Sequence, residues 1–368
     1  MQKNSTTITT LRWIVGLLFI ISGLLKANDP HGLSYKMQEY FDLWGMSGLN
    51  HLSLPLAVTM NIFEVLAGVA IILGFAMNLF SWLLLLLIIA FTFLTGYAAL
   101  SGKFKTCGCM GDCMPIPPLA SFLKDVVLLV LILIIFKYRK KVRPVVDSAV
   151  LNLVLLVSTA VFVMVTQVYV LKNLPFVDCL PYREGNKLLQ EMQAPPGSVP
   201  DSVAIVFKYK KDGRIVEFGA EEFPGDFDDS YEYIDRVDKV VRKGNATPKI
   251  EDFALLNMQG EDVTQQLLST PGRHVLVFAQ DFSGLQQSVA GFKNLLNAAA
   301  RKNIPVRIVS PLADQRPDFV PQQVALLRLD PVVNKTVARA NPTFMLLEGD
   351  RILAKKSYNQ LNDFIEKL

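Results

Sequence analysis

The residues best suited to chemistry are three cysteines on one short segment. The segment KTCGCMGDCMP, residues 105–115, contains Cys107, Cys109 and Cys113, and the fourth cysteine of the chain is Cys179. Thiols at this spacing can exchange disulfides, form a structural disulfide or bind a metal ion. The residue types alone leave these three chemistries open.

The spacing separates the three alternatives. A bridge between Cys107 and Cys109 would close a small, strained ring, whereas a bridge from either of them to Cys113 closes a looser loop relaxed by two glycines. Cys179 comes soon enough after the last apolar stretch to reach the same loop. We favour a relay or regulatory disulfide involving all four cysteines, with a structural disulfide close behind. A four-thiolate zinc site comes third, because such sites more often use paired C-x-x-C motifs, and we predict no metal.

The cysteine segment lies between apolar stretches long enough to cross a membrane. The chain has 368 residues, of which 51% are hydrophobic, and the apolar residues are concentrated before residue 172. A bilayer core needs roughly 20 apolar residues in a helix. Five stretches meet this requirement: 11–25, 55–75, 79–100, 119–136 and 149–171. The first is predicted to be retained rather than cleaved, because Lys26 comes directly after it and no small-residue cleavage motif is present.

Basic residues predict the orientation of these helices. Residues 137–143, KYRKKVR, carry five positive charges between the fourth and fifth stretches and are expected to be cytoplasmic. The N-terminus is then cytoplasmic, and the loops 26–54 and 101–118 and everything after residue 171 lie outside. We therefore expect a protein of the bacterial inner membrane with all four cysteines in the oxidising periplasm. A net charge of +4 gives no reason to expect a nucleic-acid partner.

Polar residues within the apolar stretches are expected to support the cysteines. Glu64 lies deep in the second stretch, where an unpaired carboxylate is costly, so it needs a partner such as Lys26, Lys124 or Asn61. Its role is either a helix–helix hydrogen bond or the handling of a quinone or a proton. Lys124 and Asp125 can reach the cysteine loop, and the ammonium would lower a thiol pKa.

Two further polar features belong to the outer loops. Asp112, next to Cys113, would oppose the effect of the ammonium on the thiols. The two histidines of the first outer loop, His31 and His51, are interpreted as solvated residues rather than ligands.

The first four stretches together resemble the DoxX/MauE superfamily of membrane proteins. The resemblance covers roughly residues 8–136 and rests on C-G-C-M-G-D in the cysteine loop, supported by S-G-L-L-K and D-P-H-G at 22–32 and N-I-F-E-V-L-A-G at 61–68. Vitamin K epoxide reductase is a mechanistic relative with a four-helix bundle. The resemblance implies a redox-associated role in the cell envelope.

The rest of the chain divides into a cytoplasmic loop, a tether and soluble regions. We assign residues 137–147 to the basic loop, 148–171 to a fifth helix that tethers the soluble regions, and 172–246 to a linker and a small β-containing region. That region should contain a short helix near residue 190 and a β-hairpin turning at Asp212-Gly213. Its acidic end, 223–241, is predicted to be an irregular loop that leads into a helix.

Residues 247–368 alternate strands and helices in the order β-α-β-α-β-β-α, typical of an α/β sandwich. They resemble the peroxiredoxin/TlpA branch of the thioredoxin fold, which implies a cis peptide at Asn341-Pro342. Where that branch has C-x-x-C, this chain has Asp281-Phe282-Ser283-Gly284, so dithiol chemistry is excluded here. The resemblance implies that Asp281, Ser283 and Pro342 mark a groove that binds a protein partner. A serine triad is excluded in practice, because the domain's only histidine begins a buried strand.

Two functions are compatible with these residues. The first is disulfide exchange, in the manner of a thiol–disulfide oxidoreductase, between the cysteine loop and an envelope protein docked on the C-terminal domain. The second is a non-catalytic assembly or scaffold protein whose cysteines form structural disulfides. No cofactor is certain, although a quinone is compatible with the first function.

Overall fold

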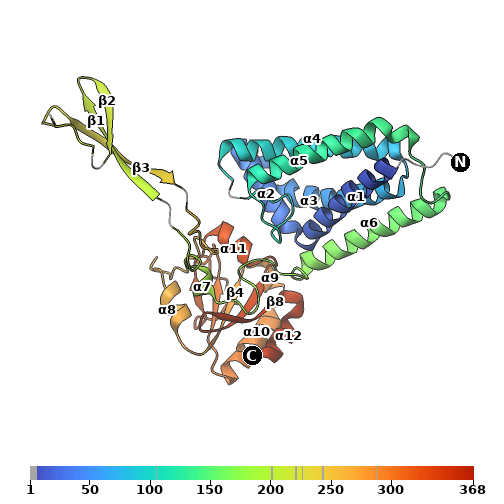
Figure 1. The fold of residues 1–368 in the computed structure, drawn as a ribbon. Helices are drawn as coiled ribbons and strands as arrows, with labels where there is room; N and C mark the ends of the chain where they lie inside the picture. Colours follow the sequence, from blue (N-terminus) through green and yellow to red (C-terminus); the bar gives the residue numbers. More distant parts are fainter. Residues whose placement is uncertain are drawn as a thin grey trace.

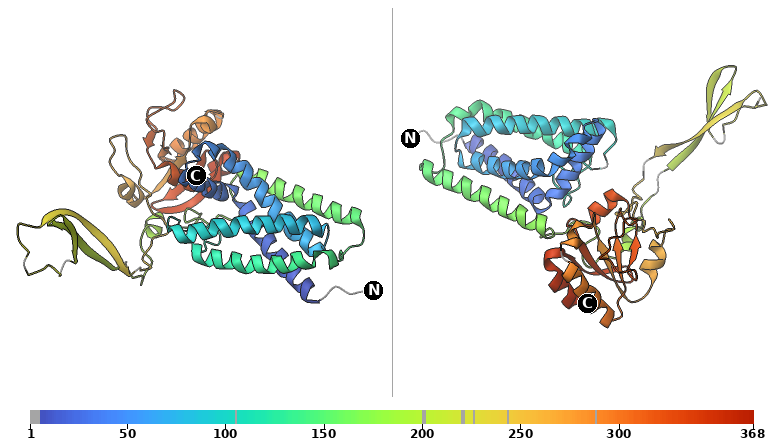
Figure 2. Two further views of the ribbon diagram at one scale, coloured as in Figure 1. Left: turned by 90° about the horizontal axis from the view of Figure 1, so that it is seen from above. Right: turned by 180° about the vertical axis from the view of Figure 1, so that it is seen from behind.

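The computed structural model describes residues 6–104, 106–199, 202–219, 222–225, 227–242, 244–287 and 289–368. Lys105, the first residue of the cysteine segment, lies outside the described residues. The chain forms a helical bundle, a slender β-arm and a mixed α/β domain (Figure 1). The arm projects away from both other parts in every view (Figure 2).

The bundle contains the five helices that, among the described residues, are long and apolar enough to cross a membrane, as predicted. They are α1 (Thr6–Asn28), α3 (Ser53–Leu73), α4 (Met77–Ser101), α5 (Pro118–Tyr138) and α6 (Ala149–Lys172). Many large apolar side chains point outward from them, as expected for a surface in contact with lipid. The protein is therefore a membrane protein.

Small residues bring α1 and α3 together. A Cβ atom added to Gly16 would lie 2.7 Å from the carbonyl oxygen of Gly68, and one added to Gly68 would lie 2.6 Å from that of Gly16. Such close backbone approach is characteristic of helix packing in membranes. The α1–α3 pair supplies much of the frame on which the cysteine loop rests.

The fifth long helix, α6, lies along the side of the bundle against α3 (Figure 1). Buried amides join the two helices: Asn61 donates to the Gln167 carbonyl oxygen at 3.0 Å, and Gln167 donates to the Val58 carbonyl at 3.2 Å. Asn61 is thus used in fixing α6. The position of α6 determines where the chain leaves the membrane.

Short elements close the two ends of the bundle. At the end of the bundle that carries the cysteine segment, Asp29 caps α2 (Pro30–Leu43) by accepting a hydrogen bond from the Gly32 amide, and α2 leads into η1 (Ser47–Leu52). At the other end, η2 (Arg139–Lys141) continues from α5. There the buried Arg12 donates to the Ile71 and Ile72 carbonyls at 2.8 and 2.6 Å, satisfying the C-terminus of α3.

The arm is a three-stranded antiparallel sheet in the order β2-β1-β3. Its strands are β1 (Ser202–Lys211), β2 (Arg214–Gly219) and β3 (Glu232–Arg242). The predicted turn at Asp212-Gly213 is confirmed, with φ of +50° and +77°. The predicted helix in 223–241 is wrong, because this segment supplies β3. Its β-branched residues favour a strand once β1 offers an edge to pair with.

The C-terminal domain is built on a five-stranded sheet in the order β6-β5-β4-β7-β8. Strands β4 to β6 are parallel, and β7 and β8 are antiparallel to their neighbours. The strands are β4 (Arg273–Phe278), β5 (Val306–Val309), β6 (Ala325–Leu327), β7 (Thr343–Glu348) and β8 (Arg351–Ser357). Before α8 the chain turns at Gly260 and pairs with itself through the antiparallel bridge Leu256–Asp262, while Leu256 also bridges Arg328.

Helices cover both faces of this sheet and bury two separate cores. They are α8 (Thr264–Ser269), α9 (Ser283–Gln286), α10 (Val289–Arg301), α11 (Pro331–Val337), η3 (Tyr358–Gln360) and α12 (Leu361–Lys367). Phe292 and Phe364 lie in one core, and Leu276 and Phe278 lie in the other. The strand β6 and the helix α11 were not predicted, since three and seven residues give too little periodicity.

The segment between α6 and the arm packs on the C-terminal sheet. Tyr182 and Leu188 are buried in its second core, and the backbone of Lys187 forms an isolated antiparallel β-bridge with that of Arg351. The short helix α7 (Leu188–Glu191) confirms the helix expected near residue 190. The chain therefore passes from the membrane directly onto the C-terminal domain. Cys179 lies in this connecting segment, between α6 and α7.

Candidate functional site

The four cysteines form one disulfide and one pair of free thiols. Cys113 is bonded to Cys179, with their Cα atoms 4.9 Å apart, while Cys107 and Cys109 are free. The expectation that Cys179 reaches the loop is confirmed. The bridges weighed within the loop, from Cys107 or Cys109 to Cys113, are not formed in this structure.

The cysteine loop, which we define as residues 102–117, packs against the C-terminal end of α1. Gly108 and Gly111 adopt φ of +68° and +69°, a region that disfavours other residues, and this lets the chain turn sharply between the thiols. The Ser22 hydroxyl of α1 donates to the carbonyl of Cys109 at 3.1 Å. The loop is thereby held directly over the polar interior of the bundle.

The two free thiols differ in their ionisation. The pKa of Cys109 is lowered to about 6, and the largest cause is the hydrogen bond that the Cys107 thiol donates to it. Burial acts in the opposite direction and raises the pKa, whereas the nearby Lys124 ammonium lowers it further. The pKa of Cys107 is raised by that same hydrogen bond and by burial. The Ser121 hydroxyl also lies 3.2 Å from the sulfur of Cys109. Cys109 is therefore the thiol that ionises near neutral pH.

A buried ion pair lies below the loop. Lys26 pairs with Glu64, and both side chains are almost completely buried, so Lys26 is the partner that Glu64 requires. The Ser22 hydroxyl oxygen also lies 3.1 Å from the Glu64 carboxylate, so its single proton is shared between this pair and the carbonyl of Cys109. The helix–helix role weighed for Glu64 is thus present.

A second polar pair comes from α5. Lys124 pairs with Asp125, and the buried carboxylate of Asp125 accepts a hydrogen bond from Thr95 at 3.1 Å. Lys124 remains partly exposed and contributes to the lowered pKa of Cys109. The supporting role predicted for Lys124 therefore has a geometric basis.

The disulfide lies at the contact between the bundle and the C-terminal domain. Each of its cysteines comes directly after an aspartate, and each aspartate pairs with a buried cation of that domain. Asp112 accepts from Arg339 at 2.5 Å, and Asp178 accepts from Lys355 at 2.7 Å. We call these two ion pairs the aspartate clamp.

Further contacts reinforce the clamp. Arg339 also donates to Asp29 at 2.8 Å and lies over the Tyr35 ring. Burial alone would lower the pKa of Arg339, but Asp29 and Asp112 outweigh it and raise that pKa. Burial lowers the pKa of Lys355, and Asp178 partly offsets this effect. The cations are held in place by their carboxylate partners.

The linker that carries Cys179 is fixed from the membrane side as well. The Asn28 side chain donates to the Val177 carbonyl at 2.9 Å and accepts from the Val177 amide at 3.1 Å. The end of α1 thus holds the chain two residues before Cys179. Sequence reasoning missed Asn28, Arg339 and Lys355, although the repeated Asp-Cys dipeptide was a visible signal.

The two histidines His31 and His51 differ in their exposure. His31 stacks on Tyr35 with ring centroids 5.7 Å apart, and burial lowers its pKa to about 4, with Asp29 opposing and Arg339 supporting this shift. His31 is half-buried on α2, so the expectation of a solvated loop residue holds only in part for it. His51 is exposed, as expected.

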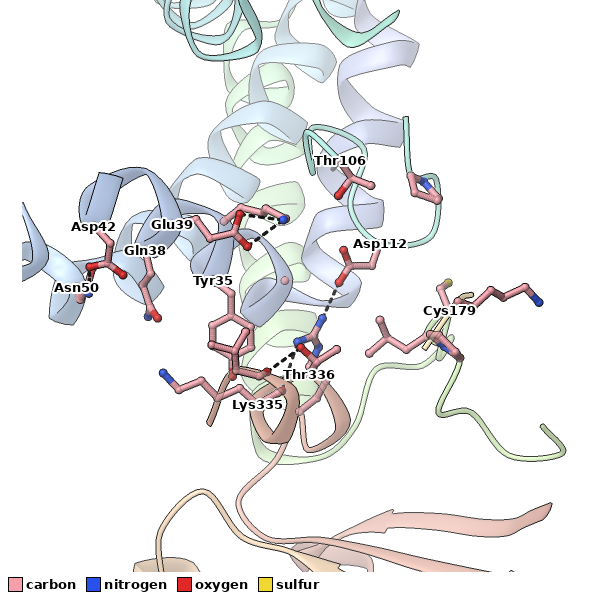
Figure 3. Close-up of a pocket in the computed structure, with 18 residues that line it drawn as sticks. Tyr35, Gln38, Glu39, Asp42, Asn50, Thr106, Asp112, Cys179, Lys335 and Thr336 are labelled. Carbon is pink, nitrogen blue, oxygen red and sulfur yellow. Dashed lines mark hydrogen bonds and ion pairs between the residues drawn. The ribbon is translucent and has the colours of Figure 1, made fainter. Parts of the chain in front are cut away.

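A cleft of about 660 Å³ lies between α2 and α11 (Figure 3). The bundle contributes Tyr35, Lys36 and Glu39, the C-terminal domain contributes Lys335 and Thr336, and Cys179 lies in the wall. Cys113 instead lines a small neighbouring cavity that it shares with Cys179. Of the two bonded cysteines, Cys179 lines the larger cleft and Cys113 does not.

The residues predicted to bind a partner are together but lie apart from this cleft. The Ser283 amide and the Asn341 side chain each donate to Asp281 at 2.9 Å, and Gly284 packs against Pro342. The Asn341-Pro342 bond is cis, as predicted. Partner binding at Asp281, Ser283 and Pro342 stays a prediction.

The cysteines do not form a metal site. Over the described part of the chain, no group of three or more His, Cys, Asp or Glu side chains could hold a metal ion. Two of the four sulfurs are joined to each other, so a four-thiolate set is not formed in this structure.

Comparison with known proteins gives a match for the bundle. Residues 4–138 match the family model of methylamine utilisation protein MauE, which covers α1 to α5 and the cysteine loop. Residues 203–243, the arm, match a domain of unknown function (DUF8463). No curated protein and no solved structure matches the chain. The bundle is therefore similar to MauE, and the C-terminal domain is interpreted from its own structure.

Proposed function

We propose that this protein carries out thiol–disulfide exchange at the outer face of the bacterial inner membrane. One observation carries the proposal: two cysteine pairs in different redox states and surroundings meet at one loop, which carries three of the four cysteines. The Cys113–Cys179 disulfide faces the C-terminal domain, and the Cys107/Cys109 dithiol lies over the bundle interior. A relay needs two such pairs close to each other.

The direction of electron flow can be argued from the two pairs. A disulfide between Cys107 and Cys109 closes a strained ring and is the stronger oxidant. A partner dithiol is oxidised by Cys113–Cys179, and the resulting dithiol then reduces a Cys107–Cys109 disulfide. Cys109, with its lowered pKa, is the better leaving thiolate. Reoxidation of the inner pair transfers two electrons and two protons to an acceptor of the quinone class.

The location of this chemistry is part of the proposal. The basic residues between α5 and α6 favour a cytoplasmic position for that loop. The cysteine loop and the C-terminal domain are at the other end of the helices, which is the periplasmic side. Disulfides persist in that compartment.

The C-terminal domain is proposed to be a thioredoxin-like domain that has lost its dithiol. The order of its strands, the helices on both faces and the cis peptide before β7 support this interpretation. Its role is to position the disulfide through the aspartate clamp and to hold an envelope protein partner.

Replacing Cys107 and Cys109 by serine tests the relay. In membranes of cells that express this variant, we expect the Cys113/Cys179 pair to accumulate in the reduced form, because nothing reoxidises it. Alkylation and then mass spectrometry measure the fraction reduced. An outer pair that stays as oxidised as in the wild type contradicts the relay.

A scaffold function is the second candidate, and one observation favours it. The disulfide joins the cysteine loop to the linker at the point where two ion pairs already hold the C-terminal domain. A structural disulfide at such a junction would fix the two domains relative to each other. In that case the serine variant leaves the disulfide and the phenotype unchanged.

A further inference from the structure

The cleft between α2 and α11 has no part in the transfer of electrons between the two cysteine pairs. Its walls come from two different domains, and Cys179 of the disulfide is one of the lining residues (Figure 3). The cleft is large enough for a ligand of several residues, since ligand pockets commonly measure about 300–1,000 Å³. It therefore needs an occupant that reacts with a disulfide.

We infer that the cleft receives an extended cysteine-bearing polypeptide, whose thiolate attacks the sulfur of Cys179 and expels Cys113. This inference rests on the proposed exchange function and adds the substrate class and the attacked sulfur. Cys179 is assigned because it lines the cleft, whereas Cys113 lines the small cavity behind it.

The charges of the cleft favour a polypeptide over a small charged thiol. Its acidic side chains are already bonded within the protein: Glu39 to Lys36 at 2.9 Å, Asp42 to Asn50 at 2.9 Å, and Asp112 to Arg339. The basic side chains are engaged as well: Lys36 and Lys249 pair with Glu39 and Glu191 at 2.9 and 3.0 Å, and Lys335 lies over the Tyr35 ring. A ligand such as glutathione, which would bind through its carboxylates and its ammonium group, must compete with these contacts. A polypeptide backbone needs hydrogen-bonding groups. The cleft presents the Thr106 hydroxyl and the acceptor oxygens of Gln38 and Thr336, which themselves donate to Ser53 and Val332.

The exchange balances in two steps. The substrate thiolate forms a bond to the Cys179 sulfur while the Cys113–Cys179 bond breaks, and Cys113 leaves as a thiolate. A second substrate thiolate then attacks the substrate sulfur of the mixed disulfide and releases Cys179. The substrate loses two electrons and gains a disulfide, and the outer cysteine pair gains those electrons as two thiols.

The expelled cysteine is in a suitable position for the next step. Cys113 belongs to the same loop as the inner pair and follows Cys109 by four residues, so the loop that carries the inner pair also carries the released thiolate. Attack on Cys113 would instead release Cys179, which is carried by the linker and not by the loop. The assignment of Cys179 therefore agrees with the order of a relay.

The test uses the full chain in detergent or nanodiscs with Cys107 and Cys109 replaced by serine, so that one disulfide remains. The probes are an acetylated and amidated nonapeptide of serine, alanine and glycine with one central cysteine, reduced glutathione, and 2-mercaptoethanol. Acid quenching, alkylation and mass spectrometry locate the adduct. We expect the peptide on Cys179 and the alkyl group on Cys113.

Narrowing the cleft should slow the peptide selectively. The substitution Val332→Trp places a bulky ring at an exposed position of the cleft wall, and Thr336→Trp is a second variant in the same wall. We expect adduct formation by the peptide to slow at least tenfold and that by 2-mercaptoethanol to change less than twofold. Gln265→Trp on α8, away from the cleft, is the matched control and should leave both rates unchanged.

The outcomes separate this inference from the exchange function. Three outcomes would overturn the inference and leave the exchange function intact. They are adducts on Cys113, a faster reaction of glutathione than of the peptide, and a peptide rate that neither cleft variant changes. A disulfide that reacts with none of the three thiols would overturn the exchange function itself.

Discussion

Loss of one clamp cation should make the disulfide easier to reduce. The substitution Arg339→Met removes the partner of both Asp112 and Asp29, which lie 2.5 and 2.8 Å from the guanidinium. When the cysteines are reduced, the C-terminal domain then holds Cys179 near Cys113 less firmly. The effective concentration of one thiol at the other falls, and so does the equilibrium constant for forming the disulfide.

The structure sets the size of this effect. Breaking a buried ion pair costs about 3–5 kcal/mol, and the lower end applies because the carboxylates of Asp29 and Asp112 retain some exposure. We take about half of roughly 3 kcal/mol as the part that favours disulfide formation by holding the two cysteines together. Its loss lowers the equilibrium constant for forming the disulfide about tenfold, which is about 30 mV for a two-electron couple. Thiolate stabilisation is a smaller effect at pH 7, where an ordinary cysteine with a pKa of about 8.5 is largely protonated.

The assay is a redox titration of the single outer disulfide. Protein with Cys107 and Cys109 replaced by serine is equilibrated with glutathione buffers, quenched, alkylated and quantified as reduced and oxidised forms. The control is Arg328→Met, which removes the exposed Arg328–Asp314 pair of the same domain and should leave the midpoint unchanged. A midpoint for Arg339→Met equal to that of the wild type would refute the clamp.

The free thiols, the buried ion pair and the topology give three more predictions. The rate of Cys109 alkylation should rise with pH around a midpoint near 6. The substitution Cys107→Ala should shift this midpoint upward and slow alkylation at pH 7 at least tenfold. An unshifted profile contradicts the thiol–thiol hydrogen bond. Lys26→Met should destabilise the detergent-solubilised protein by about 3–5 kcal/mol, and adding Glu64→Leu should recover much of this, as measured by thermal unfolding. Reporter fusions after α5 and after α6 should report cytoplasm and periplasm respectively, and the reverse result would remove the argument for an oxidising compartment.

Much of the fold was accessible from local sequence patterns. The five membrane helices can be located from hydropathy alone, and the hairpin at Asp212-Gly213 from the preference of that dipeptide for positive φ. The strand β3 was mistaken for a helix because Ile234, Val237 and Val241 recur at helical spacing. Pairing with β1, which local patterns do not reveal, decides the conformation there.

The candidate site was predictable in its residues but not in its pairing. Four cysteines allow three complete pairings, and spacing alone cannot choose among them. The pairing seen here depends on where the linker after α6 runs, and that path is fixed by Asn28 from α1 and Lys355 from β8. Both contacts join residues far apart in the sequence. The clamp could not be found before the two domains were placed together.

The central claim is that the two cysteine pairs exchange electrons, and the redox states of all four cysteines in native membranes test it most directly. Differential alkylation with isotopically distinct reagents, read out by mass spectrometry, measures the oxidised fraction at Cys107, Cys109, Cys113 and Cys179. The relay predicts mixed states for both pairs, and both should be reoxidised after a brief pulse of reductant. The relay is contradicted if Cys113 and Cys179 are fully oxidised while Cys107 and Cys109 are fully reduced, both before and after the pulse.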